Sequence, residues 1–186
     1  VNLMNNSIKC DWESSRKIVS DINEWNDKFS YLEEPYVSSD GEKIASITKN
    51  NEEGEVEYCI CENGKPWDNT YEKIWYLRYT ADNRLAALVG DLGDWTVSVD
   101  DVPWDNTFDF VWNPQFSSDG KKIIVYAQKE NKYFPVVDDT AWETTFSNMS
   151  GLAINHSGDK QVAVVQTKTF KEGEIHKFQE NCYSVA

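Results

Sequence analysis

The amino-acid sequence predicts an all-β protein of the β-propeller class, with about four blades of four strands each. Three observations predict this fold. A tryptophan followed four residues later by another aromatic residue occurs four times, in 25–29, 67–71, 104–108 and 142–146. Successive copies are separated by 42, 37 and 38 residues, which is about the length of one propeller blade. The 8 Trp, 9 Tyr and 8 Phe also favour many short strands that pack through aromatic side chains.

Each copy ends in a tight turn, sixteen residues after its tryptophan. Two of these turns read Ser-Ser-Asp-Gly, and all of them carry, at the same position, a residue that accepts a left-handed backbone. The residues at that position are Gly41, Asn83, Gly120 and Gly158. We therefore interpret the glycines, together with Trp25, Trp67, Trp104 and Trp142, as structural residues of a repeat.

The polar residues 1–15 show no clear period, and we expect them to form a lead-in arm. Propeller blades are expected over 16–186, with repeats starting near the four tryptophans. Residues 16–25 align with a strand of the later copies that alternates apolar and polar residues. We therefore expect a strand there, so that the first copy begins partway through a blade.

Every complete copy predicts the same order of strands. An apolar strand follows the turn, and its composition suits a strand covered on both faces: 43–48, 85–89, 122–126 and 161–165. An alternating strand comes next, at 56–61, 95–99, 133–137 and 183–186. A two-residue turn, the tryptophan segment and a short strand such as 73–76 follow. The innermost strand of the next blade is expected to start separately, at Pro35, Leu77, Pro114 or Leu152.

The sequence stops within the last alternating strand, where the earlier copies continue into a turn and a tryptophan. We expect these blades to belong to a larger propeller of about six to eight blades. The alternative is a small ring, closed by pairing between the partial blades at the two ends. In the first case the chain has open sheet edges and is expected to be less soluble or to assemble.

The charge balance is strongly acidic, with 32 Asp and Glu against 18 Lys and Arg and a net charge of -14. It argues against binding to nucleic acid, which needs clustered basic residues, and against adhesion to anionic lipid. If charge selects a partner, that partner is basic; the other interpretation is that the acidity only keeps the protein soluble. No stretch of 18 apolar residues is present, so no membrane span is expected.

The four cysteines, Cys10, Cys59, Cys61 and Cys182, form neither a metal-binding pattern nor a disulfide framework. In a strand, Cys59 and Cys61 point to the same face. We expect buried structural thiols, and such thiols favour a reducing compartment.

A carboxylate follows the tryptophan in three copies, as Asp68, Asp105 and Glu143. One interpretation is a ring of acids at one rim of the propeller, forming a cation or sugar site. The interpretation that we favour is that each acid accepts hydrogen bonds from backbone N–H groups of its own turn. The recurring tryptophans are likewise expected to wedge between blades, and the alternatives for them are a sugar-stacking surface or a route for electrons.

The segment 168–180 is an insertion that interrupts the repeat. It combines Phe170, Ile175, His176 and Phe178 with charged residues, and insertions on repeat scaffolds are where partner contacts tend to be built. We expect these four residues to bind a partner; an inert long hairpin is the alternative. The sequence has no nucleophile elbow, metal-binding His pair or phosphate-binding Gly loop, so no catalytic residue, cofactor site or metal site is expected.

The segments 38–41 and 117–120, each followed by Lys and Ile, resemble the WD40-like repeats of TolB and prolyl-peptidase propellers. The longer pattern 103–120, together with 178–185, resembles the tryptophan-rich D subunit of the Tmc electron-transfer complex of sulfate-reducing bacteria, over roughly 12–186. The resemblance implies a non-catalytic scaffold subunit without an established cofactor. It implies as partners a multihaem cytochrome, a membrane cytochrome b and an iron–sulfur subunit, and a cytoplasmic location with peripheral attachment to the membrane through the complex.

The sequence departs from that family at Asn83, which replaces the turn glycine, and at Asp101 and Asp139, where the family favours Gly. The chain is also much shorter than the family's. The alternative function is a propeller that binds a ligand or glycan, or that accompanies a hydrolase or peptidase. Such a propeller would use convergent carboxylates, for instance Asp68, Asp105 and Glu143, with tryptophan platforms.

Overall fold

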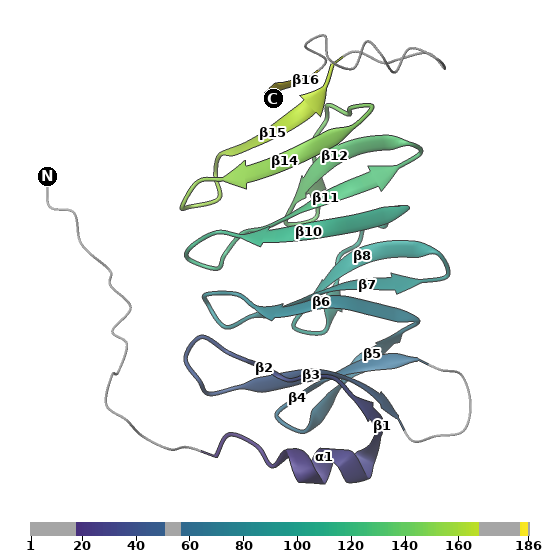
Figure 1. Cartoon of the computed structure of the whole chain (residues 1–186), viewed down its shortest axis with the longest axis vertical. Coiled ribbons are helices and arrows are strands. Elements are labelled where there is room, and N and C mark those ends of the chain that lie inside the picture. The colour runs from purple at the N-terminus through teal and green to yellow at the C-terminus, as the bar shows by residue number, and fades with distance from the viewer. Residues whose placement is uncertain (1–17, 51–56, 168–182, 186) are drawn as a thin grey trace, which may run out of the picture.

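The computed structural model describes residues 18–50, 57–167 and 183–185. Regular structure in this part of the chain is β-strand except for one short helix, and the strands form four consecutive antiparallel sheets. The sheets are stacked on one another along the long axis of the molecule (Figure 1). The predicted all-β fold of the β-propeller class, built from antiparallel blades, is therefore confirmed. We number the sheets as blades 1 to 4 in chain order.

The strands of each blade follow one another in sequence. Blade 1 contains β1 (Phe29–Leu32), β2 (Tyr36–Val37), β3 (Ile44–Asn50), β4 (Tyr58–Glu62) and β5 (Lys65–Tyr71). Blade 2 contains β6 (Lys73–Tyr79), β7 (Leu85–Asp91), β8 (Asp94–Val99) and β9 (Val102–Pro103). Blade 3 contains β10 (Phe110–Phe116), β11 (Ile123–Lys129), β12 (Lys132–Val137) and β13 (Thr140–Ala141). Blade 4 contains β14 (Met149–Ile154), β15 (Gln161–Gln166) and β16 (Tyr183–Val185).

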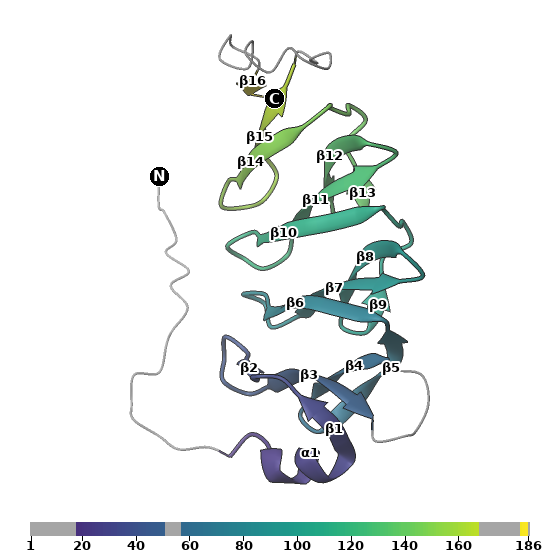
Figure 2. The same ribbon diagram turned by 45° about the vertical axis from the view of Figure 1, so that its right-hand side comes forward.

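Within blades 2 and 3, the first and last strands lie at opposite edges of the sheet. Figure 2 shows β6 and β10 on one side of the stack and β9 and β13 on the other. Residues at equivalent positions of successive blades therefore lie above one another, and this stacking brings side chains from different repeats together.

Apolar layers between neighbouring blades form the core. Between blades 1 and 2, for example, Ile47 packs in the same cluster as Leu77, and equivalent clusters lie between the later blades. The second strand of blades 2 and 3 is buried over 85–90 and 123–127, because a neighbouring blade covers each of its faces. The apolar runs in the sequence predicted this double burial.

The structure joins two strands that the sequence analysis separated. We expected a short strand at 73–76 and a new strand from Leu77, but β6 runs through both, and β10 is continuous in the same way. A β-bulge interrupts the pairing, and the bulged residue has positive φ at Tyr76 (57°), Asn113 (50°) and Gly151 (68°). A bulge bends a strand without ending it, and a linear pattern of residues does not distinguish a bulge from the end of a strand.

Within the described residues 18–24 no strand precedes the first tryptophan, which corrects the alignment of that part of 16–25 with later strands. Residues 18–21 lie outside any strand, and Trp25 belongs to a helix, α1 (Ile22–Lys28). The Asp21 carboxylate caps this helix by accepting the backbone N–H of Asn23 at 3.0 Å. The helix lies against blade 1 at the end of the stack (Figure 1), and its tryptophan is 1% exposed.

The turns with the left-handed residues are stacked from blade to blade. Their φ angles are positive, as the sequence predicts, at Gly41 (72°), Asn83 (64°), Gly120 (77°) and Gly158 (70°). The Asn83 side-chain amide donates to the Asp40 carboxylate of the preceding blade at 2.8 Å. Gly120 approaches the turn of blade 2 so closely that a Cβ there would lie 2.9 Å from the backbone nitrogen of Ala81. This position therefore needs glycine for space as well as for φ.

Candidate functional site

A repeated set of hydrogen bonds, which we call the Asp clasp, joins neighbouring blades. The backbone N–H groups of Asp68 and Asn69 in blade 1 donate to the Asp101 carboxylate of blade 2, at 2.7 and 3.2 Å. The Asn69 side-chain amide donates to the carbonyl oxygen and to Oδ1 of Asp101, at 2.8 and 3.0 Å. Asp105 and Asn106 make the same four contacts with Asp139 of blade 3, between 3.0 and 3.2 Å. The clasp therefore recurs once per blade boundary in the middle of the stack.

The clasp carboxylates come from two-residue turns in which both residues are left-handed. The φ angles are 49° at Asp100 and 69° at Asp101, and Asp138 and Asp139 of blade 3 are alike. The carboxylate of the first Asp also accepts a hydrogen bond within its own blade. In blade 2, the backbone N–H of Leu85, the first residue of β7, donates to Asp100 at 2.8 Å. A left-handed backbone is costly for residues other than glycine, and the hydrogen bonds of the two carboxylates offset that cost.

The predicted role of the recurring acids is corrected by this geometry. We expected the Asp68 and Asp105 carboxylates to accept N–H groups of their own turns, but between described residues neither carboxylate accepts a hydrogen bond. The backbone N–H groups of the two residues donate to Asp101 and Asp139. The acceptors Asp101 and Asp139 each follow a second aspartate in a two-residue turn, a signal that the sequence contains. Glu143 is exposed and follows β13.

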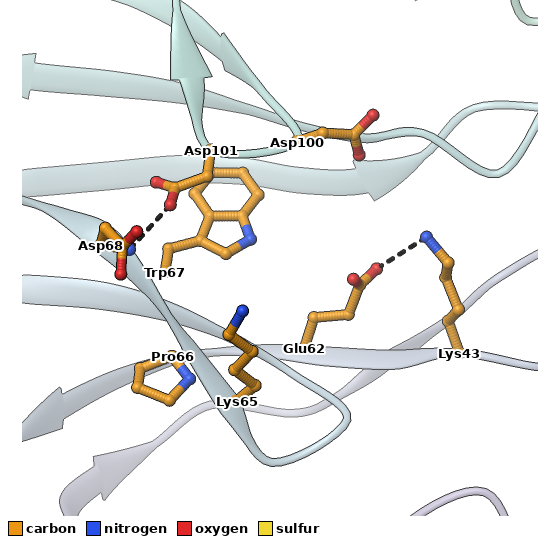
Figure 3. A pocket seen from close by; sticks show the side chains of 8 residues that line it. All are labelled: Lys43, Glu62, Lys65, Pro66, Trp67, Asp68, Asp100 and Asp101. Atoms are coloured by element: carbon orange, nitrogen blue, oxygen red, sulfur yellow. Dashed lines mark hydrogen bonds and ion pairs between the residues drawn. The ribbon is translucent and has the colours of Figure 1, made fainter.

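A cavity of about 310 Å³ lies beside the clasp, between blades 1 and 2 (Figure 3). The floor comes from the β4–β5 turn and the start of β5, and the opposite wall comes from the β8–β9 turn. The lining residues are Lys43, Glu62, Lys65, Pro66, Trp67, Asp68, Asp100 and Asp101. Of the three acids predicted to converge, only Asp68 lines this cavity.

Part of the cavity wall is held by a network around Glu62. The Lys43 ammonium lies 3.3 Å from Glu62 Oε1, and the Tyr79 hydroxyl donates to the same oxygen at 2.9 Å. Burial, with the Glu62 carboxylate as the second cause, raises the pKa of Tyr79 far above its ordinary value, so the phenol stays a donor. The Lys65 ammonium, in contrast, forms no ion pair with any residue of the described part of the chain.

Two charged residues of the cavity, Glu62 and Lys65, have no charged counterpart in blades 2 and 3. Glu62 and Lys65 face each other across the β4–β5 turn, and the equivalent pairs in blades 2 and 3 are Val99 with Val102 and Val137 with Thr140. The blade architecture therefore does not require a charge at either position. Comparison of the copies within the sequence would have found this difference, but only the structure shows that it lines a cavity.

A second unusual surface, which we call the aromatic rim, consists of Tyr36 in β2 of blade 1 and of Trp75, Tyr76 and Arg78 in β6 of blade 2. Trp75 is 50% exposed and Tyr76 is 44% exposed. The Arg78 guanidinium lies 4.2 Å from the ring centre of Tyr36 and 5.0 Å from that of Tyr76. These cation–π contacts link one arginine to tyrosines of two neighbouring blades.

Three of the four recurring tryptophans lie against the layers between blades, as the sequence predicted, and the prediction is wrong for Trp25, which lies in α1 at the end of the stack. Trp67 packs on the cluster between blades 1 and 2, and Trp104 and Trp142 pack on the cluster between blades 2 and 3. Trp25 is buried beside Cys61 and Phe29, in the cluster under α1.

Cys59 and Cys61 are buried thiols, as expected. Burial is the main cause that raises the pKa of each to about 11, well above the ordinary value for cysteine. The expected partner-binding residues Phe170, Ile175, His176 and Phe178, like the other two cysteines, lie outside the described residues.

In the part of the chain that the structure describes, no helix is long and apolar enough to cross a membrane. Searched in the same residues, His, Cys, Asp and Glu side chains form no group of three or more that could hold a metal ion.

No family model matches the sequence, and no curated protein matches it. Among solved structures, the chain is similar to the β-propeller domain of the trilobed protease from Pyrococcus furiosus, described as having an open velcro topology, with 16% identity and a TM-score of 0.48 over 77% of this chain and 51% of that chain. It is also similar to an oligogalacturonate lyase in complex with manganese, with 12% identity and a TM-score of 0.44 over 74% of this chain and 47% of that one. An acylaminoacyl peptidase in complex with Z-Gly-Gly-Phe-chloromethyl ketone has 13% identity and a TM-score of 0.42, over 81% of this chain and 30% of that one. The chain thus spans about half of these proteins or less, and nothing about its activity follows from the likenesses.

Proposed function

We propose that this chain is a non-catalytic interaction scaffold whose partner docks on the aromatic rim. The observation that carries the proposal is Tyr76, a large residue with φ of 57° and a side chain 44% exposed. The equivalent bulge positions carry Asn113 and Gly151, which adopt the same backbone at lower cost. A tyrosine there costs on the order of 1 kcal/mol relative to glycine, and such strain is typical of residues retained for binding.

The composition of the aromatic rim supports the same function. Tyr, Trp and Arg are the residues enriched in protein interfaces and in the few positions that supply most of the binding energy. Trp75 and Tyr76 follow one another in the chain and each exposes apolar surface, and Arg78 adds a cation that contacts two rings. The net charge of -14 favours a partner with a basic surface around the contact.

The resemblance of 103–120 to the tryptophan-rich D subunit supplies the finer form of the proposal. In that form, the partners are the cytochrome b, the iron–sulfur subunit and the multihaem cytochrome of a Tmc-like complex, and the chain is held at the cytoplasmic face of the membrane. The aromatic rim and the acidity support docking in general, and the sequence motif supports this complex in particular.

The test is affinity purification of the tagged protein from mildly solubilised native membranes, with mass spectrometry and a haem spectrum of the recovered material. Tyr76→Asn introduces the residue that blade 3 uses, so the variant should be at least as stable as the parent and should recover at least tenfold less cytochrome. Tyr31→Asn is the matched control, because Tyr31 is 41% exposed outside the aromatic rim. Recovery of the protein alone by the parent chain, or undiminished recovery by Tyr76→Asn, would contradict the proposal.

A further inference from the structure

We infer that the cavity between blades 1 and 2 is a binding site for a saccharide without negative charge, held against Trp67 by Lys65, Glu62 and Asp100. This inference goes beyond the scaffold function and concerns a different surface. It depends on three features of the cavity: its charge, its mixture of donors and acceptors, and its tryptophan.

The repeat separates the structural residues of the cavity from the others. Trp67, Asp68 and Asp101 have counterparts at the next blade boundary in Trp104, Asp105 and Asp139, so their presence is explained by packing and by the clasp. The repeat does not require Glu62 and Lys65, because valines or a threonine occupy their positions in blades 2 and 3. Of the two, only Glu62 has partners in the described chain, Lys43 and Tyr79, that account for its presence. A pair of opposite charges that the fold does not need, at the mouth of a cavity, is a feature of recognition.

The open polar groups of the cavity include both donors and acceptors. In Figure 3, the Lys65 ammonium points toward the indole of Trp67, whose nitrogen is directed to the side on which Glu62 and Asp100 lie. One oxygen of Asp100 accepts the Leu85 N–H and one oxygen of Glu62 is taken by Lys43 and Tyr79. A second oxygen remains on each of the two carboxylates. A ligand rich in hydroxyl groups uses both kinds of partner, since each hydroxyl donates and accepts.

The charge of the lining excludes an anionic ligand. Two lysines face four carboxylates, which leaves a formal charge of about -2, and of the two lysines only Lys43 forms an ion pair in the described chain. A phosphate or a sugar acid would meet this excess of negative charge, whereas a neutral or amino sugar would not. The cavity volume of about 310 Å³ lies at the lower end of the range of ligand pockets, which suits one or two sugar rings.

Trp67 adds the apolar surface that a sugar ring requires. Its side chain is half-buried against the layer between blades, so its orientation is fixed before a ligand arrives. The C–H face of a pyranose packs on such an indole while its hydroxyls reach the polar groups around the rim of the ring. Pre-orientation lowers the entropy lost on binding.

The experiment is ligand-observed NMR and isothermal titration of the full chain with methyl β-glucoside, N-acetylglucosamine, glucosamine and cellobiose. Galacturonate and inorganic phosphate serve as anionic comparators. At least one of the four uncharged or amino sugars should bind with a dissociation constant in the millimolar range or below, and both comparators should bind at least tenfold more weakly. No binding of the four sugars, or preference for a comparator, would overturn the inference.

Variants that copy the other blades locate the binding. Lys65→Val introduces the residue found at this position in blade 2, leaves the Glu62 network intact and should weaken sugar binding at least tenfold. Val102→Thr, which gives blade 2 the residue of blade 3, is the matched control and should leave binding unchanged. Binding that survives Lys65→Val at full strength would place the sugar elsewhere and refute the assignment. The variants of the aromatic rim should not affect sugar binding, so failure of either proposal is distinguishable from failure of the other.

Discussion

Replacing Asp101 by Gly tests how much the Asp clasp contributes to the cohesion of blades 1 and 2. The substitution removes the carboxylate and with it three hydrogen bonds, from the backbone N–H of Asp68 and from the backbone and side-chain amides of Asn69. The bond from Asn69 to the carbonyl oxygen of residue 101 is retained. Glycine also relieves the left-handed backbone, because φ of 69° carries no steric cost without a Cβ. Two opposing effects therefore determine the result.

The loss of the hydrogen bonds is the larger of the two effects. Each contributes about 0.5–1.5 kcal/mol, and the exposed position places them in the lower part of that range, so the loss is about 2–3 kcal/mol. Relief of the left-handed backbone returns about 1 kcal/mol. The free energy of unfolding should therefore fall by about 1–2 kcal/mol, which for a chain of this size lowers the Tm by about 2–8 °C.

The assay is thermal and urea unfolding, followed by circular dichroism, of the parent chain and three variants. Asp101→Asn keeps one acceptor oxygen and tolerance of the left-handed region, so it should be intermediate between the parent and Asp101→Gly. Asp101→Ala loses the same hydrogen bonds without relief of the backbone and should be the least stable. If Asp101→Gly is as stable as the parent or more stable, the clasp does not hold the blades and the apolar layers alone account for their stacking.

Three further predictions concern the turns and the buried thiols. Gly120→Ala should lower the free energy of unfolding by at least about 2 kcal/mol more than Gly41→Ala. Both glycines have positive φ, but only at Gly120 would a Cβ meet the backbone of a neighbouring turn. Equal urea midpoints of the two variants would contradict this close approach. Cys59 and Cys61 should react with iodoacetamide at pH 8 only after unfolding, because a pKa of about 11 leaves roughly a thousandth of each thiol as thiolate and burial excludes the reagent. Peptide mapping after labelling in native buffer and in urea measures this reactivity. Rapid labelling of the native chain would refute the prediction. The Ser117 hydroxyl and the Lys121 backbone N–H donate to the Asp119 carboxylate and lower its pKa in the folded chain. This stabilisation is therefore present above about pH 4 and is lost as the pH falls below that value. Asp119→Asn should flatten the decline of the urea midpoint between about pH 5 and pH 3.

The repeat could be predicted because it depends on local signals. The spacing of the tryptophans and the left-handed residues at Gly41, Gly120 and Gly158 reflect the backbone of single turns, and the apolar runs reflect burial on both faces of one strand. Each of these features involves neighbours in the chain, so a linear pattern records it.

Helix α1 shows where that reasoning failed. The repeat aligned 16–25 with strands, but Asp21 supplies a helix cap and the partner turn of blade 1 is Asn63–Gly64, which has no carboxylate at the clasp position. The tryptophan of this copy donates its indole N–H to Ser20 at 3.0 Å and packs into a closed cluster instead. A repeat therefore predicts the structure of one copy only where the adjacent turn supplies the residue that this copy contacts in the other blades.

The candidate sites depend on relations that the sequence does not record. The double-Asp turns were visible as departures from a family pattern, but their direction of bonding was not, because Asn69 and its acceptor Asp101 are 32 residues apart. Likewise, Tyr76 is ordinary in a sequence and is distinctive only through its φ and its exposure.

The sequence by itself therefore determined the all-β class, the length of the blade and the positions of the turns that carry left-handed residues. These depend on periodicity and on conformational preferences of individual residues, which are properties of short segments. Only the tertiary structure decided which carboxylate meets which N–H group, that Glu62 and Lys65 open onto a cavity, and that an aromatic rim is exposed. These depend on how one blade is seated on the next, because stacking brings together residues a full repeat apart.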